Sequence, residues 1–229
     1  MNNIVEVVIL VEGQTEKIFV KELLGPYLAD RNIFLYPTIF NKPGEKGGDV
    51  RFSRAQRDIG GHLKSRQDTY VTIMMDYYGT KEWPGLDVSK EQRTHSGKAK
   101  VINEETAKAV QGLFSEQNRG YRFIPYVSMY ETEALYFCAP AAIAEVLGAN
   151  SAEIESIVHN CGEPEAINDS PETAPSKRLI KLSNDTFKKT TTGIAIAKTI
   201  GIQRMREHCP LFNDWICKIE ALASAEIAE

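Results

Sequence analysis

The sequence predicts an α/β fold in which a mostly parallel sheet is flanked by helices. Short apolar segments rich in β-branched residues alternate with segments whose apolar residues recur at helical spacing, as in strand–helix–strand units. After about residue 140 no further strand pattern occurs, and the remaining segments are helical in pattern. We therefore expect an α/β core over residues 1–140 and a mainly helical C-terminal extension, residues 141–229, packed on that core.

Four segments carry strand patterns. The first is an almost continuous apolar run, which is typical of a strand buried on both faces. Pro37 in the second predicts an edge strand or a strand end, because proline donates no ladder hydrogen bond, and Pro125 interrupts the fourth. The predicted strands span residues 4–11, 33–40, 70–75 and 121–127.

Helical spacing of apolar residues predicts a helix after the first strand, over residues 15–24, which Gly25-Pro26 should kink or end. Residues 41–49, rich in glycine and lysine, should form a flexible loop, and the proline-containing stretch 163–176 an extended excursion. The other predicted helices span residues 98–116, 141–147, 152–158, 193–200 and 210–222.

Composition excludes several protein classes. A net charge of -4 and a pI of 5.7 argue against affinity for nucleic acid over the whole surface, although a local basic patch is compatible with both. No apolar run approaches the roughly 20 residues of a membrane span. The four cysteines lack CxxC spacing, which disfavours a zinc knuckle or a disulfide framework. We expect a cytoplasmic protein with no membrane partner.

Carboxylates follow two of the predicted strands. Glu12 follows the first strand and Asp76 the third, so a parallel sheet brings both to the edge where open α/β sheets bind ligands. Carboxylates that lie close together repel unless a cation or a shared proton separates them, and Mg²⁺ commonly takes one or two of them. The alternative is that Glu12 and Glu16 are solvated, with Glu16 favouring the positive end of its helix.

A third strand end is also followed by acids, Glu131 and Glu133. Residues two positions apart do not share a helix face, so we expect at most one of them to reach the common edge.

Two basic groups are candidates for phosphate binding. Arg51, Arg54 and Arg57 are spaced one helical turn apart, and Lys177 and Arg178 follow the proline-containing excursion. Each group is either solvated surface or a phosphate-binding face, since arginine can hold phosphate with two hydrogen bonds.

Other chemistries lack their motifs. The sequence has no GxxxxGK[ST] loop, which disfavours nucleotide hydrolysis by the chain itself, and no GxSxG elbow. The four histidines show no metal-ligand spacing.

Two short stretches, Val11–Glu16 and Met75–Gly79, resemble the Toprim domain of topoisomerases, primases and the nucleases named for overcoming lysogenization defect. With Tyr130–Leu135, Ala174–Arg178 and Cys209–Trp215, the whole chain resembles a Toprim-like family of uncharacterised bacterial proteins, often encoded beside ABC-type ATPases.

The resemblance implies roles for individual residues. Glu12 corresponds to a glutamate that acts in acid–base chemistry or near the metal, and Asp76 to the first aspartate of a Mg²⁺-binding Asp-x-Asp pair. Tyr78 stands in place of the second aspartate, so Glu131 or Glu133 would have to supply the missing oxygen.

Two functions remain open. The first is a Mg²⁺- or Mn²⁺-dependent nuclease, or related phosphodiester-transfer enzyme, of a bacterial defence or mobile-element system. It would act on DNA or RNA with an ABC-type ATPase partner. Lys177 and Arg178, then Arg51 and Arg54, would bind phosphates. The second is a catalytically silent module that binds the ATPase or nucleic acid. Three acidic strand ends favour the enzyme, and Tyr78 favours the silent module.

Overall fold

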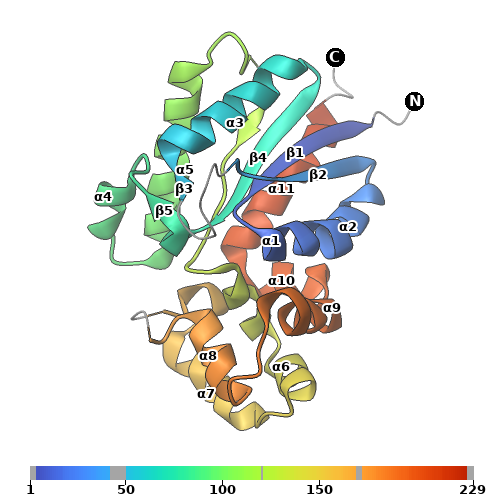
Figure 1. Ribbon diagram of the computed structural model, residues 1–229, viewed down its shortest axis with the longest axis vertical. Helices are drawn as coiled ribbons and strands as arrows, with labels where there is room; N and C mark the ends of the chain where they lie inside the picture. The colour runs from blue at the N-terminus through green and yellow to red at the C-terminus, as the bar shows by residue number, and fades with distance from the viewer. Residues whose placement is uncertain (1–3, 42–49, 120, 169–171, 226–229) are drawn as a thin grey trace.

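The computed structural model describes residues 4–41, 50–119, 121–168 and 172–225. Its main sheet is parallel throughout, with the strand order β2-β1-β4-β6 and with β7 also paired to β4, which confirms the predicted fold class (Figure 1). A second, two-stranded parallel sheet joins β3 to β5. The strands are β1 (Val5–Val11), β2 (Ile33–Ile39), β3 (Val50–Arg51), β4 (Thr69–Asp76), β5 (Thr80–Lys81), β6 (Phe123–Ile124) and β7 (Val127–Ser128).

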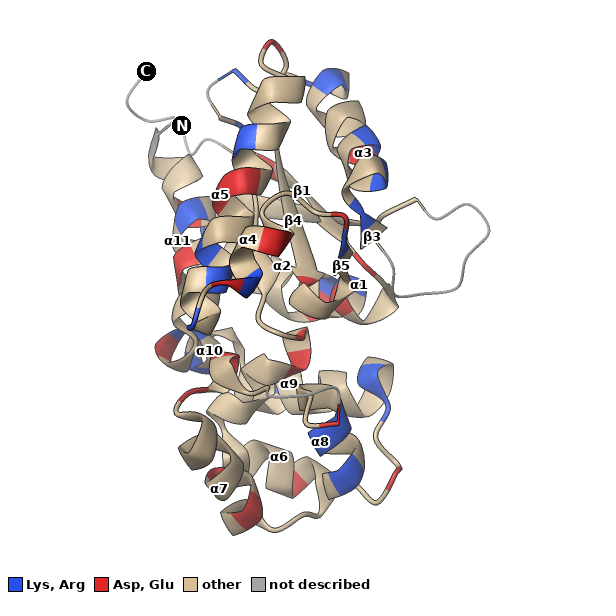
Figure 2. Ribbon diagram, turned by 90° about the vertical axis from the view of Figure 1, so that its left-hand side faces the viewer, with Lys and Arg blue, Asp and Glu red and all other residues tan. Residues whose placement is uncertain are grey.

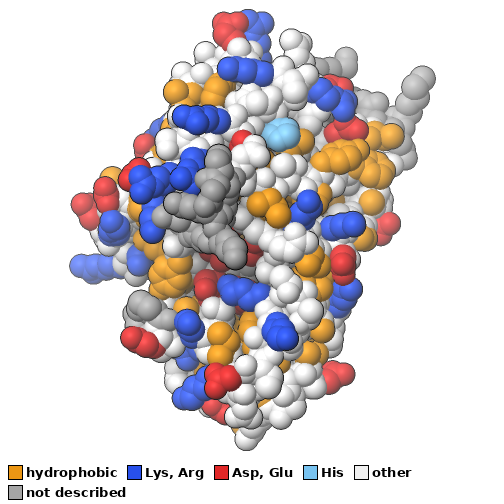
Figure 3. Space-filling model, viewed as in Figure 1, with side chains coloured by type: hydrophobic (Ala, Val, Ile, Leu, Met, Phe, Trp, Pro, Cys, Tyr) orange, Lys and Arg blue, Asp and Glu red, His pale blue; other side chains and the backbone are white. Residues whose placement is uncertain are grey.

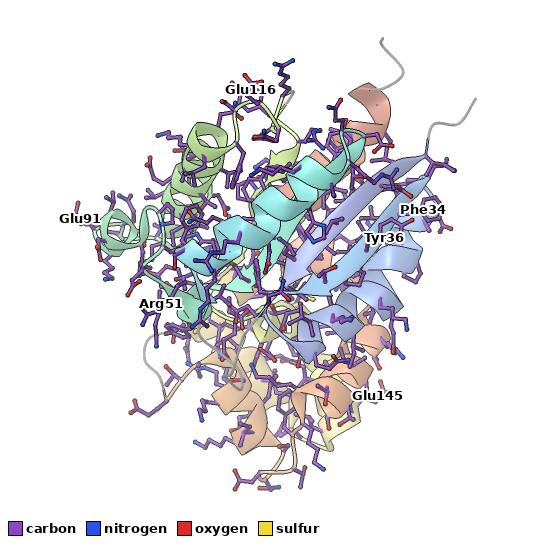
Figure 4. The ribbon with its side chains drawn as sticks, turned by 45° about the horizontal axis from the view of Figure 1, so that its top comes forward. Phe34, Tyr36, Arg51, Glu91, Glu116 and Glu145 are labelled. Atoms are coloured by element: carbon purple, nitrogen blue, oxygen red, sulfur yellow. The ribbon has the colours of Figure 1, made fainter. Side chains whose placement is uncertain are left out.

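The edge strand is β2, as Pro37 predicts, and its Phe34 and Tyr36 are exposed (Figure 4). The predicted strand over residues 121–127 is instead two short strands, β6 and β7. Pro125 lies between them and cannot donate to a ladder, which explains the interruption.

Helices cover both faces of the sheet (Figure 1). Val7 and Ile9 of β1 pack with Phe19 and Trp215 in one core, whereas Leu10 packs in the other core against the second helical layer. This alternation follows from the strand period of two. The first layer contains α1 (Gln14–Phe19), α2 (Gly25–Ala29) and α11 (Pro210–Ala225), and the second contains α3 (Phe52–Ser65) and α5 (His95–Leu113).

The first helix does not end at Gly25-Pro26. It continues from α1 through the π-helical turn η1 (Val20–Leu24) into α2. The N–H of Gly25 bonds to the carbonyl of Val20, five residues back, and Pro26 lies in the first turn of α2. A π turn rearranges the local hydrogen bonds, so the missing N–H of proline is accommodated without ending the helix.

The C-terminal part is helical, as predicted, and forms the lower part of the molecule in Figure 1, except that α11 returns to pack on the sheet. There Nε1 of Trp215 donates to Oγ1 of Thr72 (2.9 Å), and its ring stacks on Tyr126.

Residues 42–49 of the predicted flexible loop lie outside the described residues. The remaining helices are α4 (Leu86–Lys90), α6 (Pro140–Leu147), α7 (Ser151–Cys161), α8 (Pro175–Leu182), α9 (Ile194–Ile200), α10 (Ile202–His208) and the short turns η2 (Tyr77–Gly79), η3 (Thr132–Cys138), η4 (Pro164–Ala166) and η5 (Lys189–Gly193).

Within the described ranges, no helix is both long enough and apolar enough to cross a membrane.

Candidate functional site

The carboxyl ends of β1 and β4 lie side by side, as the sequence predicts. Val11 pairs with Met74, so Glu12 and Asp76 follow at the same edge of the sheet. The helical C-terminal part lies below this edge, and Figure 3 shows acidic and basic side chains together near the middle of this face.

Asp76 is buried and held in a fixed orientation. Its Oδ1 accepts hydrogen bonds from the backbone N–H (2.8 Å) and the hydroxyl (2.9 Å) of Thr132. Burial raises the pKa of Asp76 well above its ordinary value. The negative charges of Glu12, Glu133 and Glu16 raise it further, and Lys189 opposes them. The structure thus places three further acids where their charges disfavour ionisation of Asp76.

The Glu12 carboxylate packs directly against the backbone of Gly79 in η2. A Cβ atom added at Gly79 would overlap that carboxylate, so any larger residue there would force the Glu12 side chain to move. Glu16 is not solvated. It is buried, and its Oε2 accepts from the N–H of Gly13 (3.0 Å) at the start of α1, so the alternative of a solvated Glu16 does not hold.

Glu131 and Glu133 both contact Lys189, and Glu133 is the one whose charge raises the pKa of Asp76. Nζ of Lys189 lies 3.0 Å from Oε2 of Glu133 and 3.7 Å from Oε1 of Glu131. Glu131 has an extended backbone and precedes η3, so the rule about helix faces does not apply to this pair.

Glu133 is fully buried, and its second oxygen, Oε1, has no hydrogen-bond partner among the described residues. Burial raises its pKa to about 7, although the charge of Lys189 acts in the opposite direction. For Lys189 the balance is reversed: burial would lower its pKa, but the acids around it raise it above its ordinary value. Carboxyl groups with pKa values raised by burial next to a specific charge partner are concentrated at functional sites.

Glu131 also joins the site to α8. Its Oε2 accepts from the N–H of Ser176 (2.8 Å), and its Oε1 accepts from the Ser176 hydroxyl (2.9 Å). This contact places the predicted phosphate-binding residues Lys177 and Arg178 close to the acidic edge. Lys177 is exposed, whereas Nε of Arg178 donates to the carbonyl of Thr173 (2.8 Å).

The second predicted basic group lies on the other part of the molecule, at the start of α3. Figure 2 shows Lys and Arg positions along α3, and Arg51, labelled in Figure 4, pairs with Glu82 (2.9 Å). Both side chains are largely exposed. Arg54 lines a small pocket of about 190 Å³ with Arg57 and Asp58. The structure thus gives these arginines acidic neighbours other than the acids of the site.

Lys189 and Gly79 were not predicted as site residues. Lys189 pairs with Glu133 across 56 residues of sequence, so no local spacing reveals the contact. Gly79 directly follows Tyr78, and a glycine next to a candidate metal motif is a signal that would have justified attention.

Among the described residues, no group of three or more histidine, cysteine, aspartate or glutamate side chains is arranged to hold a metal ion. Tyr78, in place of a second aspartate, contributes no carboxylate. Its hydroxyl contacts Nδ2 of Asn168, and the residue is 41% exposed.

Comparison with known proteins gives one match. Residues 11–220 match a family described as "Domain of unknown function (DUF4276)". No curated protein and no solved structure matches the chain. The matched region includes both strand ends, the Glu131–Glu133 segment and Lys189. The chain therefore belongs to the DUF4276 family.

Proposed function

We propose that the acidic edge is the catalytic centre of a metal-dependent nuclease or a related phosphodiester-transfer enzyme. One observation carries the proposal: the paired ends of β1 and β4 bring Glu12 to Asp76, and the charges of Glu12 and Glu133 both raise the pKa of Asp76. Gathering buried carboxylates in this way costs stability, and such unfavourable arrangements are concentrated at functional sites.

The donor atoms suit Mg²⁺ or Mn²⁺, which prefer carboxylate oxygens. Gly79 leaves room for the Glu12 carboxylate, and Oε1 of Glu133 has no partner among the described residues. A cage of three or more protein ligands is not needed, because Mg²⁺ is often held by one or two carboxylates, with water and substrate phosphates completing its shell. Glu12 and Asp76 would hold the ion, which when bound polarises the scissile phosphate and activates water.

The protein's own groups have distinct parts in this proposal. Thr132 holds the Asp76 carboxylate in one orientation through two hydrogen bonds. Glu133, with a pKa of about 7, can take up or release a proton near neutral pH. Lys189 offsets part of the negative charge that would otherwise repel a phosphate, and Lys177 on α8 adds an exposed positive charge.

A second candidate function is a catalytically silent module that binds an ATPase partner or nucleic acid. Tyr78 supplies no carboxylate, and Lys189 already pairs with both candidate replacements, Glu131 and Glu133. These contacts favour a stable structural cluster over an open metal site. The ABC-type ATPase partner, the defence or mobile-element role, the DNA or RNA substrate and the cytoplasmic location all belong to the proposal and rest on the sequence.

Cleavage assays separate the two functions. The chain, alone and with a candidate ABC-type ATPase partner, is incubated with labelled DNA and RNA in Mg²⁺ or Mn²⁺. We expect cleavage by the wild type and by Asp214→Asn, a control at an exposed acid paired with Lys218, and no cleavage by Asp76→Asn. If no condition gives cleavage by the wild type, or if Asp76→Asn cleaves normally, the enzyme is excluded and the silent module is the better account.

A further inference from the structure

Three tyrosine rings form a continuous aromatic group beside the acidic edge. The ring centroids of Tyr77 and Tyr78 are 6.2 Å apart, and Tyr130 lies 5.4 Å from Tyr77 and 5.7 Å from Tyr78. Tyr77 and Tyr78 directly follow Asp76, and Tyr130 directly precedes Glu131. The strand ends that supply the acids therefore also supply the aromatic group.

The members of this group differ in exposure. Tyr130 is buried, at 8% exposed, whereas Tyr78 is 41% exposed. The N–H of Tyr78 donates to the carbonyl of Tyr130 (3.3 Å), which ties the two segments together. Tyr78 offers ring surface to a ligand, with Tyr130 behind it.

A surface pocket of about 570 Å³ lies next to this group. It is lined by Tyr130 and Asn168, by Arg93 just before α5, by His95 and Ser96 in its first turn, and by Glu163, which pairs with His95. Oδ1 of Asn168 is buried and has no hydrogen-bond partner among the described residues, which is uncommon in a protein interior. The volume lies within the range of small-ligand sites.

Two positive charges lie beside the rings and have no acidic partner within the described part of the chain. Arg93 is exposed and lines the pocket. Nζ of Lys98 lies over the rings of Tyr130 and Tyr77, 5.4 Å and 5.9 Å from their centroids. His95, in contrast, is already paired with Glu163 (3.0 Å). In a chain of net charge -4, cations without counter-charges beside an aromatic surface favour an anionic, aromatic ligand.

We propose that this surface binds single-stranded nucleic acid, with a base stacked on Tyr78 and backbone phosphates held by Arg93 and Lys98. The inference rests on the proposed function and adds its substrate class. An exposed ring stacks on an unpaired base of any sequence, whereas a base inside a duplex presents no free face. Tyr78, which interrupts the acidic motif, thereby acquires a role of its own.

The test is fluorescence anisotropy in the presence of EDTA, so that no cleavage step is involved. The probes are a labelled short oligothymidylate, an abasic strand of the same length and a duplex of the same length. Tyr78→Ala should weaken oligothymidylate binding about tenfold or more and leave abasic-strand binding unchanged. Tyr78→Phe should retain binding, because it keeps the ring. The matched control is Tyr121→Ala. This tyrosine is 74% exposed and precedes β6 at the amino-terminal ends of the strands, whereas the acids lie at the carboxyl ends.

The phosphate contacts are tested separately. Arg93→Ala should weaken binding of the oligothymidylate and the abasic strand alike and lower the salt slope by about one unit, whereas Arg119→Ala, at an exposed arginine paired with Glu116, should not. The inference is overturned if the wild type binds no oligothymidylate, if it binds the duplex more tightly than the oligothymidylate, or if Tyr78→Ala binds the oligothymidylate as tightly as the wild type. Cleavage that is insensitive to Tyr78 would overturn this inference and leave the nuclease standing. Tyr78-dependent binding of oligothymidylate without cleavage in Mg²⁺ or Mn²⁺ would leave this inference standing and overturn the nuclease.

Discussion

Among the described residues, Lys189 is the positive charge that lies against the buried acids Glu133 and Asp76, so we predict what Lys189→Met does to stability. The substitution keeps most of the side-chain length and removes only the charge that faces Glu133 at 3.0 Å. Breaking a buried ion pair by removing one partner typically costs about 3–5 kcal/mol, because an uncompensated charge remains. The Lys189 side chain is 40% exposed, so solvent screens part of the interaction, and we expect about 2–3 kcal/mol.

The cost should depend on pH. The pKa of Glu133 is 4.5 in a free side chain and about 7 in the fold, so its favourable contribution is complete below pH 4.5 and is lost as the pH rises through 7. Without Lys189 the pKa of Glu133 in the folded state rises further, so the free energy of unfolding continues to fall at higher pH. Lys189→Met should therefore differ little from the wild type at about pH 5.5, where Glu133 is largely protonated in both, and most at about pH 8.5.

Denaturant unfolding at these two pH values measures the effect, with Lys188→Met as the matched control, since Lys188 is exposed and directly precedes Lys189. The reasoning is refuted if Lys189→Met loses the same stability at both pH values, or no more than the control at the higher one.

Three further predictions concern other parts of the molecule. Gly79→Ala should displace the Glu12 carboxylate and weaken Mn²⁺ binding about tenfold or more in calorimetry, without unfolding the chain. Burial raises the pKa of Glu165 from 4.5 to about 7, so the free energy of unfolding of the wild type should fall by up to about 3 kcal/mol as the pH rises from 4.5 to 7. Glu165→Gln should remove that part of the pH dependence. Replacing Lys177 and Arg178 by alanine should weaken binding of all nucleic acids alike and lower the salt slope by about one unit for each lost phosphate contact.

Each of these predictions has a control. For Gly79→Ala the control is Gly61→Ala, which adds a methyl group where no atom lies within 4 Å. For Glu165→Gln it is Glu145→Gln, at an exposed acid, and for the Lys177 and Arg178 variant it is Lys100→Ala, at an exposed lysine on α5. An unaltered Mn²⁺ affinity in Gly79→Ala would contradict the first prediction. Parallel stability–pH curves for Glu165→Gln and the wild type would contradict the second, and an unchanged salt slope the third.

The fold and the position of the site were predictable because both follow from short-range patterns. Apolar runs identified β1, β2 and β4, and the parallel arrangement then required Glu12 and Asp76 to meet at one edge. Pro37 likewise identified an edge strand, because a missing N–H is a local property.

The rest of the site depends on tertiary packing, which local patterns do not encode. Lys189 reaches Glu133 only because the C-terminal helices fold back below the sheet. Glu131 and Glu133 contact the same lysine because Glu131 is extended and precedes η3. No local sequence signal shows where η3 begins. The continuation of the first helix beyond Gly25-Pro26 depends on a π turn that propensity rules do not anticipate.

Calorimetric titration with Mn²⁺ tests the central claim most directly, because it asks whether Glu12 and Asp76 form a metal centre. Asp76→Asn keeps the Oδ1 atom that accepts from Thr132 and relieves the repulsion at the site, so the variant should fold. We predict that the wild type and Asp214→Asn bind one Mn²⁺ ion per chain, and that Glu12→Gln and Asp76→Asn do not. Binding that is unchanged in both variants, or absent from the wild type, would contradict the account.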